Sequence, residues 1–274
     1  MESKIWLITG VSKGLGSAIA AAALSQGDLV IGTVRTAEDK AEFEKHPAAK
    51  AYIMDVIHTH EIPELVSNII NTYGRIDVLV NNAGYGAFGM IEEFEEEEVI
   101  RQFLVNFIAP WRFVKAVLPA MRTHRNGTIV QISSRAGLVA GVGNGIYAAS
   151  KFAVEGMTEA LFEEVSTFGI KVLLVEPGAL RTDFFGASLA YAYKEIDSYR
   201  TSLTDVRENT KSLHGKQTGD PAKAAAAIVK AVGDDTNILR LPLTSAAIEA
   251  MRSKVREYQA AVLFNEDIAR SIDY

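Results

Sequence analysis

Apolar and polar positions alternate along the chain in blocks that predict strands and helices in turn. The strand blocks are short and mostly apolar, at 4–8, 29–34, 51–54, 78–81, 128–133, 172–176 and 238–241. Continuous apolar runs are typical of parallel strands that helices cover on both faces. Helical patterns lie between them, near 14–26, 37–46, 60–73, 96–122, 147–168 and 220–233. This order predicts an α/β fold with a doubly wound parallel sheet and a single domain over residues 1–274.

Three segments depart from this alternation. Residues 182–219 place Phe184, Phe185, Leu189, Tyr191, Tyr193 and Tyr199 among charged residues and lack a clear period. Residues 244–274 read as an amphipathic helix that either covers the domain or contacts a second subunit. The acidic stretch 92–98 is expected to be the exposed start of a helix, where acids suit the helix dipole, and we expect no metal site there.

Composition narrows the functional classes. The chain has 274 residues, 48% hydrophobic and 23% charged, a net charge of −6 and no Cys. The negative charge argues against a partner nucleic acid, and the lack of Cys excludes disulfides and thiolate chemistry. We find no signal-peptide core and no apolar stretch near the ~20 residues of a membrane span. The sequence therefore predicts a cytoplasmic protein with no membrane partner.

A glycine-rich turn follows the first predicted strand. Gly10, Gly14 and Gly16 stand between the apolar run 4–8 and an Ala-rich helical segment. A turn of this kind offers free backbone N–H groups and a positive helix end to a phosphate. The spacing is G-x-x-x-G-x-G, which differs from the usual G-x-G-x-x-G dinucleotide fingerprint. Its position still predicts a nucleotide site in a Rossmann-like sheet.

A second candidate for chemistry is the pair Tyr147 and Lys151. Side chains at i and i+4 share one face of a helix, so the phenol would feel the ammonium group. A free phenol has a pKa of about 10, and a neighbouring cation lowers it. The pair alone is also typical of a solvated helix face, but it predicts an acid–base catalyst when combined with the glycine turn.

With these segments, the chain resembles the short-chain dehydrogenase/reductase family, in its compact single-domain branch. The resemblance covers residues 4 to about 232. Its motifs occur in the family's order: TGVSKGLG at 9–16, Asp55 after the third strand, NNAG at 81–84, Asn106 in LVNFIAP, Ser133-Ser134, YAASK at 147–151, and Pro177-Gly178 with Thr182.

The resemblance implies an oxidoreductase that interconverts a ketone or aldehyde and its alcohol. Tyr147 would exchange the proton with the substrate oxygen, and Ser134 would hydrogen-bond that oxygen. Lys151 would lower the Tyr147 pKa and bind the nicotinamide ribose, and Asn106 would hold a water that relays protons to Lys151. Ser134 is chosen over Ser133 because it precedes Tyr147 by the family interval of thirteen residues.

The same resemblance implies the cofactor contacts. They are Gly10, Ser12, Lys13, Gly14, Leu15, Gly16, Arg35, Asp55, Val56, Asn82, Ala83, Gly84, Tyr147, Lys151, Pro177, Gly178 and Thr182.

The end of the second strand predicts NADP(H) as the cofactor. NAD-selective members carry an acid there that accepts bonds from the ribose hydroxyls, but this chain has Val34. Arg35 follows at once and Lys13 lies in the glycine turn, and two cations suit a 2′-phosphate. Asp28 lies at the opposite end of the strand.

The expected substrate is a small hydrophobic carbonyl compound or alcohol, steroid- or retinoid-like or a small xenobiotic ketone. By resemblance, residues 182–219 form a lid over the substrate; the alternative is a surface helical hairpin whose aromatic side chains pack on the body. We expect a homodimer or homotetramer. The pocket residues are expected to be almost all apolar: Phe88, Met90, Val139, Ala140, Val142, Leu180, Phe184 and Phe185.

Two other functions stay open at this point. A redox-inactive nucleotide-binding sensor on the same fold usually lacks the Tyr or the Lys, whereas both are present here. An epimerase or dehydratase of the extended branch would show the other glycine spacing and a longer C-terminal domain.

Overall fold

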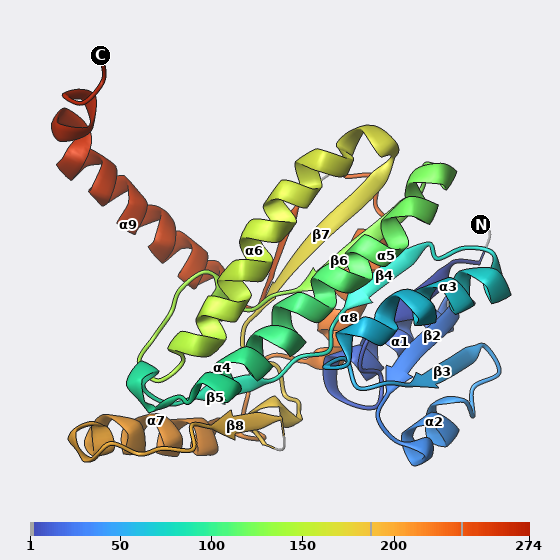
Figure 1. Ribbon diagram of the computed structural model, residues 1–274, viewed down its shortest axis with the longest axis horizontal. Coiled ribbons are helices and arrows are strands. Elements are labelled where there is room, and N and C mark those ends of the chain that lie inside the picture. The colour runs from blue at the N-terminus through green and yellow to red at the C-terminus, as the bar shows by residue number, and fades with distance from the viewer. Residues whose placement is uncertain (1–2, 187, 237) are drawn as a thin grey trace.

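A seven-stranded parallel sheet forms the centre of the molecule, in the strand order β3-β2-β1-β4-β6-β7-β9 (Figure 1). The computed structural model describes residues 3–186, 188–236 and 238–274. From β1 the chain adds β2 and β3 on one side of the sheet and then β4, β6, β7 and β9 on the other, so the order of strands switches between β1 and β4. Open α/β sheets bind ligands at such a switch point, beyond the carboxyl ends of their strands. The predicted fold class, a doubly wound parallel sheet, is confirmed.

The strands match the predicted apolar blocks closely. They are β1 (Ile5–Ile8), β2 (Leu29–Val34), β3 (Ala49–Ile53), β4 (Val78–Asn81), β6 (Gly127–Ile132), β7 (Ile170–Pro177) and β9 (Arg240–Leu243). The last strand begins two residues later than predicted, because its pairing with β7 starts at Arg240 opposite Leu174. The apolar pattern of the sequence alone does not predict which residues of β7 and β9 pair.

Helices cover both faces of the sheet. One face carries α3 (Ile62–Tyr73), α5 (Ala109–His124) and α6 (Gly145–Val165), and the other carries α1 (Gly14–Ser25), α2 (Ala37–Phe43) and α8 (Pro221–Gly233). Alternate residues of a strand face opposite sides. In β1, Leu7 packs with the first group and Trp6 and Ile8 pack with the second. Two buried apolar layers therefore hold the sheet rigid and fix the positions of its strand ends.

The helix predicted over 96–122 is interrupted. It consists of α4 (Glu96–Phe103), a π-helical turn at Leu104–Ile108 and α5. By length and apolar composition, the stretch 96–124 is sufficient to cross a membrane, so the sequence prediction that no such stretch exists was wrong. Its own side chains Phe113, Val117 and Met121 are buried in the core against the sheet.

Segment 182–219 forms a separate layer beyond the carboxyl ends of the strands (Figure 1). It contains β8 (Leu189–Tyr191), which pairs in parallel with β5 (Gly86–Phe88), and α7 (Arg200–Leu213). Position 187 of this segment lies outside the described residues. The predicted tail helix is present as α9 (Ser245–Arg270), and Figure 1 shows it leaving the body of the molecule.

Candidate active site

The glycine turn has backbone angles and a close approach that a residue with a Cβ atom would not tolerate. Gly10 and Gly14 have φ values of 72° and 65°, in the left-handed region. A Cβ on Gly16 would lie 2.2 Å from the Gly10 carbonyl oxygen, so only glycine fits where α1 approaches the turn. The N-cap of α1, Lys13, makes no side-chain capping bond, which leaves the first N–H groups of the helix to other acceptors.

A hydrogen-bond network joins this turn to the end of β4. The Thr9 hydroxyl accepts from the backbone N–H groups of Asn82 and Ala83, each at 2.9 Å. The Asn82 side chain donates to the carbonyls of Thr9 and Gly10, at 2.9 and 3.0 Å. Asn82 and Ala83 were predicted cofactor contacts, and the structure places them against the glycine turn. Thr9 was missed as a positioning residue, although it begins the motif at 9–16.

The remaining predicted cofactor residues gather at the same strand ends. Thr182 faces the glycine turn, since a Cβ on Gly14 would lie 3.6 Å from its own Cβ. A Cβ on Gly178 would lie 2.3 Å from the Thr244 hydroxyl oxygen, so the side chain between β9 and α9 packs closely on the turn after β7. Asp55 caps a turn by accepting from the Ile57 N–H at 3.2 Å. Among the other predicted cofactor contacts, Ser12 and Gly84 are exposed, Leu15 and Pro177 are half-buried, and Val56 is buried.

The two cations chosen for a 2′-phosphate differ in their surroundings. Arg35 is exposed at the end of β2, whereas the Lys13 ammonium lies 4.0 Å from the Asp183 carboxylate. Val34, in the place of the acid of NAD-selective members, is only 2% exposed and belongs to an apolar cluster. An acid at position 34 would therefore be buried.

Tyr147 and Lys151 lie one turn apart on α6 and are both 6% exposed. The Lys151 ammonium is 5.9 Å from the centroid of the Tyr147 ring and donates to the Ile132 carbonyl at 2.8 Å. The Ser134 side chain hydrogen-bonds the Tyr147 phenol. Ser134 follows β6, so the end of that strand and one face of α6 bring three of the four predicted catalytic groups together.

Burial controls the protonation of this pair. It raises the pKa of Tyr147 to about 12, against the smaller lowering effect of the Ser134 hydrogen bond. It lowers the pKa of Lys151 to about 8, against the opposing effect of Glu155. From the sequence, we expected Lys151 to lower the Tyr147 pKa. That expectation was wrong for the structure as it stands, because desolvation outweighs a cation that is turned toward a backbone carbonyl.

Asn106, the fourth predicted catalytic residue, lies in the π-helical turn between α4 and α5. Its amide donates to the Tyr85 carbonyl and the Ser150 hydroxyl, both at 3.1 Å, and its oxygen accepts from the Tyr85 N–H at 3.2 Å. π-Helical turns occur often at functional sites because they redirect a side chain from the regular helical position. Asn106 thereby joins the loop after β4 to the helix that carries Lys151.

Ser133, the serine not chosen, has a structural partner. It donates to Glu155, which also accepts from Arg240 at 2.6 Å. Arg240 further bonds Glu176 and Glu159, so one guanidinium joins β9, β7 and α6. Burial raises the pKa of Glu155, and it raises that of Glu176 to about 7. This cluster was not predicted, because its members lie far apart in the sequence.

Aromatic side chains close over the Tyr147 phenol. The Phe88 ring stacks at 6.5 Å and the Phe184 ring lies at 5.7 Å, between centroids, and Phe185 contacts Phe184 edge-on at 5.4 Å. The structure thus brings three predicted pocket residues together at the candidate catalytic group.

The other predicted pocket residues lie further out or face elsewhere. Met90 and Val139 are partly buried, and Ala140 and Val142 are exposed on the loop before α6. Leu180 is buried against Gly219, where a Cβ would lie 2.6 Å from the leucine side chain. Leu180 therefore holds the two ends of segment 182–219 together.

Two glutamates, one in the 3-10 turn before α4 and one in the first turn of α4, bind segment 182–219. Glu93 is fully buried and accepts from the backbone N–H groups of Met90, at 2.9 Å, and Ile196, at 3.0 Å. Glu98 accepts from the Tyr193 N–H at 3.1 Å. The acidic stretch was predicted to be exposed, which is wrong for Glu93. The Glu93 carboxylate accepts hydrogen bonds from backbone N–H groups that lie outside regular helices and strands.

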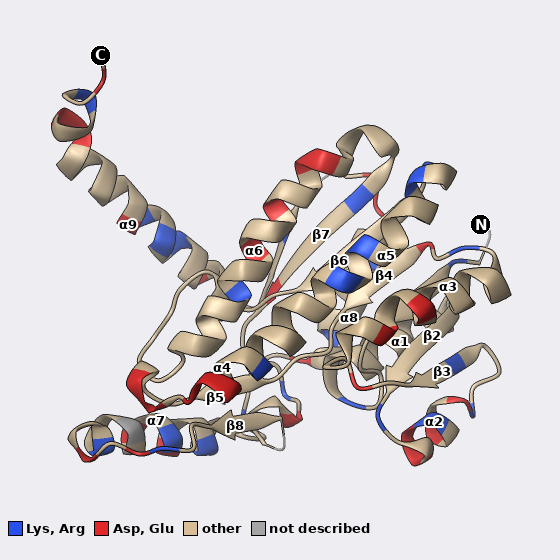
Figure 2. Cartoon of the chain, in the orientation of Figure 1, with Lys and Arg blue, Asp and Glu red and all other residues tan. Residues whose placement is uncertain are grey.

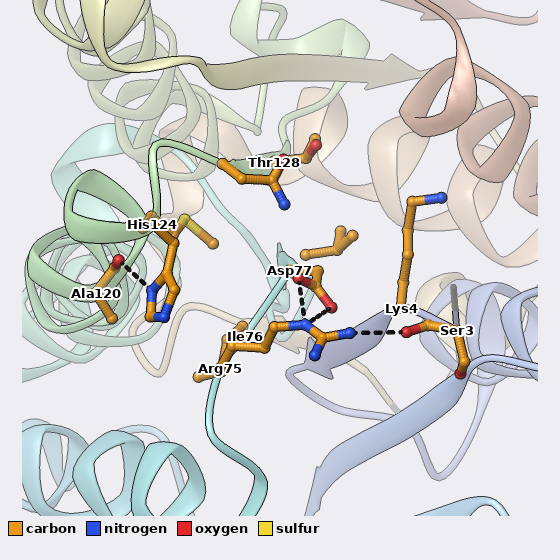
Figure 3. Close-up of a pocket in the computed structure, with 11 residues that line it drawn as sticks. Ser3, Lys4, Arg75, Ile76, Asp77, Ala120, His124 and Thr128 are labelled. Carbon is orange, nitrogen blue, oxygen red and sulfur yellow. Dashed lines mark hydrogen bonds and ion pairs between the residues drawn. The ribbon is translucent and has the colours of Figure 1, made fainter. Parts of the chain in front are cut away.

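A separate cavity of about 390 Å³ lies at the amino ends of the strands, away from this site (Figure 3). Arg75 crosses it, bound to the Asp77 carboxylate at 3.0 Å and to the Ser3 carbonyl at 3.1 Å. The Arg75 guanidinium and the Asp77 carboxylate are therefore paired with each other across the cavity.

Comparisons with known proteins agree with this geometry. A 3-ketodihydrosphingosine reductase of Bacteroides thetaiotaomicron is 40% identical over 242 residues, covering 85% of this chain and 84% of the relative. A short-chain dehydrogenase from Streptomyces avermitilis superposes with a TM-score of 0.91 and 38% identity over 99% of both chains. A metagenomic short-chain oxidoreductase solved in complex with NADP has a TM-score of 0.70 and 27% identity, over 88% of this chain and 97% of that one.

The family model for short chain dehydrogenases matches residues 4–190, which include the glycine turn, the serines after β6 and the Tyr147–Lys151 pair. These residues carry the geometry described above, and homologous chains are named oxidoreductases. The chain belongs to the short-chain dehydrogenase/reductase family.

Proposed function

We propose that this protein reduces the carbonyl group of hydrophobic ketones or aldehydes, and oxidises the corresponding alcohols in reverse, with NADP(H) as its cofactor. The observation that carries the proposal is the buried Tyr147–Lys151 pair with Ser134 on the phenol. A redox-inactive sensor on this fold has no need of such a constellation, since burying a lysine beside a phenol costs stability.

The strand ends suit a dinucleotide. Two left-handed glycines, a third that admits only a hydrogen, and the uncapped first turn of α1 form a cradle of N–H groups. When bound, the nicotinamide supplies or accepts the hydride. The protein's part is to bind and orient the reactants and to move the proton.

The proton chemistry suits reduction at neutral pH. A Tyr147 phenol with a raised pKa keeps its proton until a carbonyl oxygen gains negative charge, and it is then the donor. Ser134 would hydrogen-bond the same oxygen. Lys151, with a pKa of about 8, is mainly cationic at pH 7 and stabilises the phenolate that donation leaves.

The apolar rings over Tyr147 support a hydrophobic substrate. Phe88 extends from β5, and Phe184 and Phe185 come from segment 182–219, so this segment would act as a lid that a substrate must displace. The name of the Bacteroides relative also refers to reduction of a ketone on an aliphatic compound.

Arg35 supports the choice of NADP(H). Arg35 is exposed just after β2, and the residue before it is Val34 and not an acid. A guanidinium presents planar paired donors that suit a phosphate. Lys13 is the weaker candidate because Asp183 lies 4.0 Å from it.

Oxidation of NADPH and NADH with a panel of hydrophobic ketones and aldehydes tests the proposal. Arg35→Ser should lower kcat/KM for NADPH about ten- to a hundredfold, the loss of a charge-assisted contact of roughly 1.5–3 kcal/mol, and leave NADH nearly unchanged. Lys45→Ser removes an exposed cation that lies before β3, away from the end of β2, and serves as the control.

Preference of the wild type for NADH would contradict the cofactor assignment, as would an Arg35→Ser variant that keeps its NADPH kinetics. Tight cofactor binding with no turnover of any carbonyl in the panel would instead favour the sensor.

A further inference from the structure

Helix α9 leaves the body after its first turns. Ala247 and Ala250 are buried, but from Arg252 to the end of the helix nearly every side chain is exposed. The helix has 26 residues, and Figure 1 shows most of them extending into solvent. The similarity to the Streptomyces structure covers 99% of both chains, so it includes most of this arm.

The arm carries a heptad stripe. The stripe consists of Ile248, Met251, Val255, Tyr258, Val262, Asn265, Ala269 and Ile272, spaced alternately by three and four residues. A repeat of this kind, kept over about three heptads, is the pattern of helices that pair in a coiled coil. The exposed fractions of Val255, Val262 and Ile272 are 51%, 62% and 77%, so the body of the chain does not cover the stripe.

An uncovered stripe of this length needs a partner. Isolated helices are marginal in water, and most of their stability in proteins comes from packing of an apolar face. Asn265 is the polar member of the stripe, and one polar core residue typically sets the register of a pair at some cost in stability.

The charges of the arm point to a second copy of the chain. Its first half carries three cations, Arg252, Lys254 and Arg256, against two acids, Glu249 and Glu257. Its end carries three acids, Glu266, Asp267 and Asp273, against one cation, Arg270 (Figure 2). A parallel pair would bring like charges together. An antiparallel pair brings the basic half of each arm against the acidic end of the other.

The stripe also fits its own antiparallel copy. Its positions are symmetric about residue 260, so that Tyr258 meets Val262 of the partner subunit and Met251 meets the partner subunit's Ala269. Arg252 then flanks Glu266 of the partner subunit. A C₂ pair of this kind is self-complementary, as isologous interfaces must be.

We propose that the α9 arms of two copies of this chain pair antiparallel through the heptad stripe, about a two-fold axis near residue 260. The surface joins two subunits without involving Tyr147 or Lys151, and the proposal is independent of the proposed reaction.

Adjacent single cysteines test the pairing directly, because the chain has none of its own. Ala261 flanks the stripe one residue from the axis and would lie near Ala261 of the partner subunit, whereas Ala260 lies on the opposite side of the helix. Under mild oxidation, Ala261→Cys should form a covalent dimer and Ala260→Cys should stay monomeric on a non-reducing gel.

A second pair of variants separates the stripe from general exposure. Val255→Glu with Val262→Glu should abolish crosslinking at Ala261→Cys. Leu263→Glu with Phe264→Glu alters side chains that are 79% and 85% exposed but lie outside the stripe, and it should leave crosslinking intact.

Three results would overturn the proposal. One is equal crosslinking at both cysteine positions, and another is crosslinking of a Met251→Cys variant instead, which indicates a parallel pair. The third is the absence of crosslinking at Ala261→Cys together with sedimentation of the protein with anionic phospholipid vesicles, if Leu263→Glu with Phe264→Glu abolishes that sedimentation.

Discussion

Tyr147 and Lys151 owe their chemistry to burial more than to their mutual spacing. The i, i+4 pattern identified the pair from sequence, and the family interval of thirteen residues before Tyr147 indicated which serine belongs to it. The direction of the Tyr147 pKa was not predictable in the same way. It depends on Phe88 and Phe184, which come from β5 and from a distant segment and exclude water from the phenol.

Lys151 should impose a distinctive pH dependence on stability. Its pKa is about 8 in the folded protein, against an ordinary value of 10.5, so between these two values the unfolded chain binds more protons and stability rises with pH. Below pH 8 the cost of the buried cation is constant. Lys151→Met should remove this rise, which is at most about 3 kcal/mol.

Urea denaturation of both proteins at pH 7 and pH 10 measures the effect. The Lys151→Met variant should gain stability relative to wild type at pH 7, or lose little, and should lose that advantage at pH 10. Parallel pH profiles would mean that Lys151 is not desolvated.

At the scale of elements, the apolar blocks predicted the central strands and most helices because two-sided burial leaves a simple pattern. They did not predict the π-helical turn at Leu104–Ile108, since an extra residue in a helix changes no local composition. The prediction that the acidic stretch 92–98 is exposed was wrong for Glu93 for a related reason. Only the folded chain shows that the N–H groups at Met90 and Ile196 need the Glu93 carboxylate.

Glu93 should control the lid. Glu93→Ala leaves two backbone donors without their acceptor, so segment 182–219 should detach from α4 more easily. We expect KM for the carbonyl substrate to change by about tenfold or more with a smaller change in kcat, because Tyr147 and Lys151 are untouched. Limited proteolysis should cut the segment faster than in wild type.

Glu97→Ala is the matched control, since this exposed glutamate belongs to the same acidic stretch. An unchanged cleavage rate in Glu93→Ala, or equal effects of both variants, would show that Glu93 does not anchor the segment.

Across the whole molecule, Arg240 joins the last strand to the body through three carboxylates from two other elements. A buried pair of this kind adds little net stability, but removing one partner leaves charges uncompensated at a cost of about 3–5 kcal/mol. No local sequence signal marks such a cluster, because Glu155, Glu176 and Arg240 meet only after the sheet has formed.

Arg240→Met should therefore destabilise the protein strongly at pH 8 and less at pH 5. The Glu176 pKa is raised to about 7, so that carboxyl can take up a proton as the pH falls and so relieve the unpaired charge. Thermal unfolding at the two pH values provides the measurement, with Arg252→Met, on the exposed arm, as the control. A deficit that is the same at both pH values would contradict this account of the cluster.

The central claim is that Tyr147 is the proton donor, and single-turnover reduction of a carbonyl by Tyr147→Phe tests it most directly. Phenylalanine keeps the ring contacts with Phe88 and Phe184, so folding and NADPH affinity should stay close to wild type. Turnover should fall by about two orders of magnitude or more, the usual scale of general acid catalysis. Tyr73→Phe, on α3, should be fully active. A Tyr147→Phe variant that retains turnover within about tenfold of wild type would contradict the assignment.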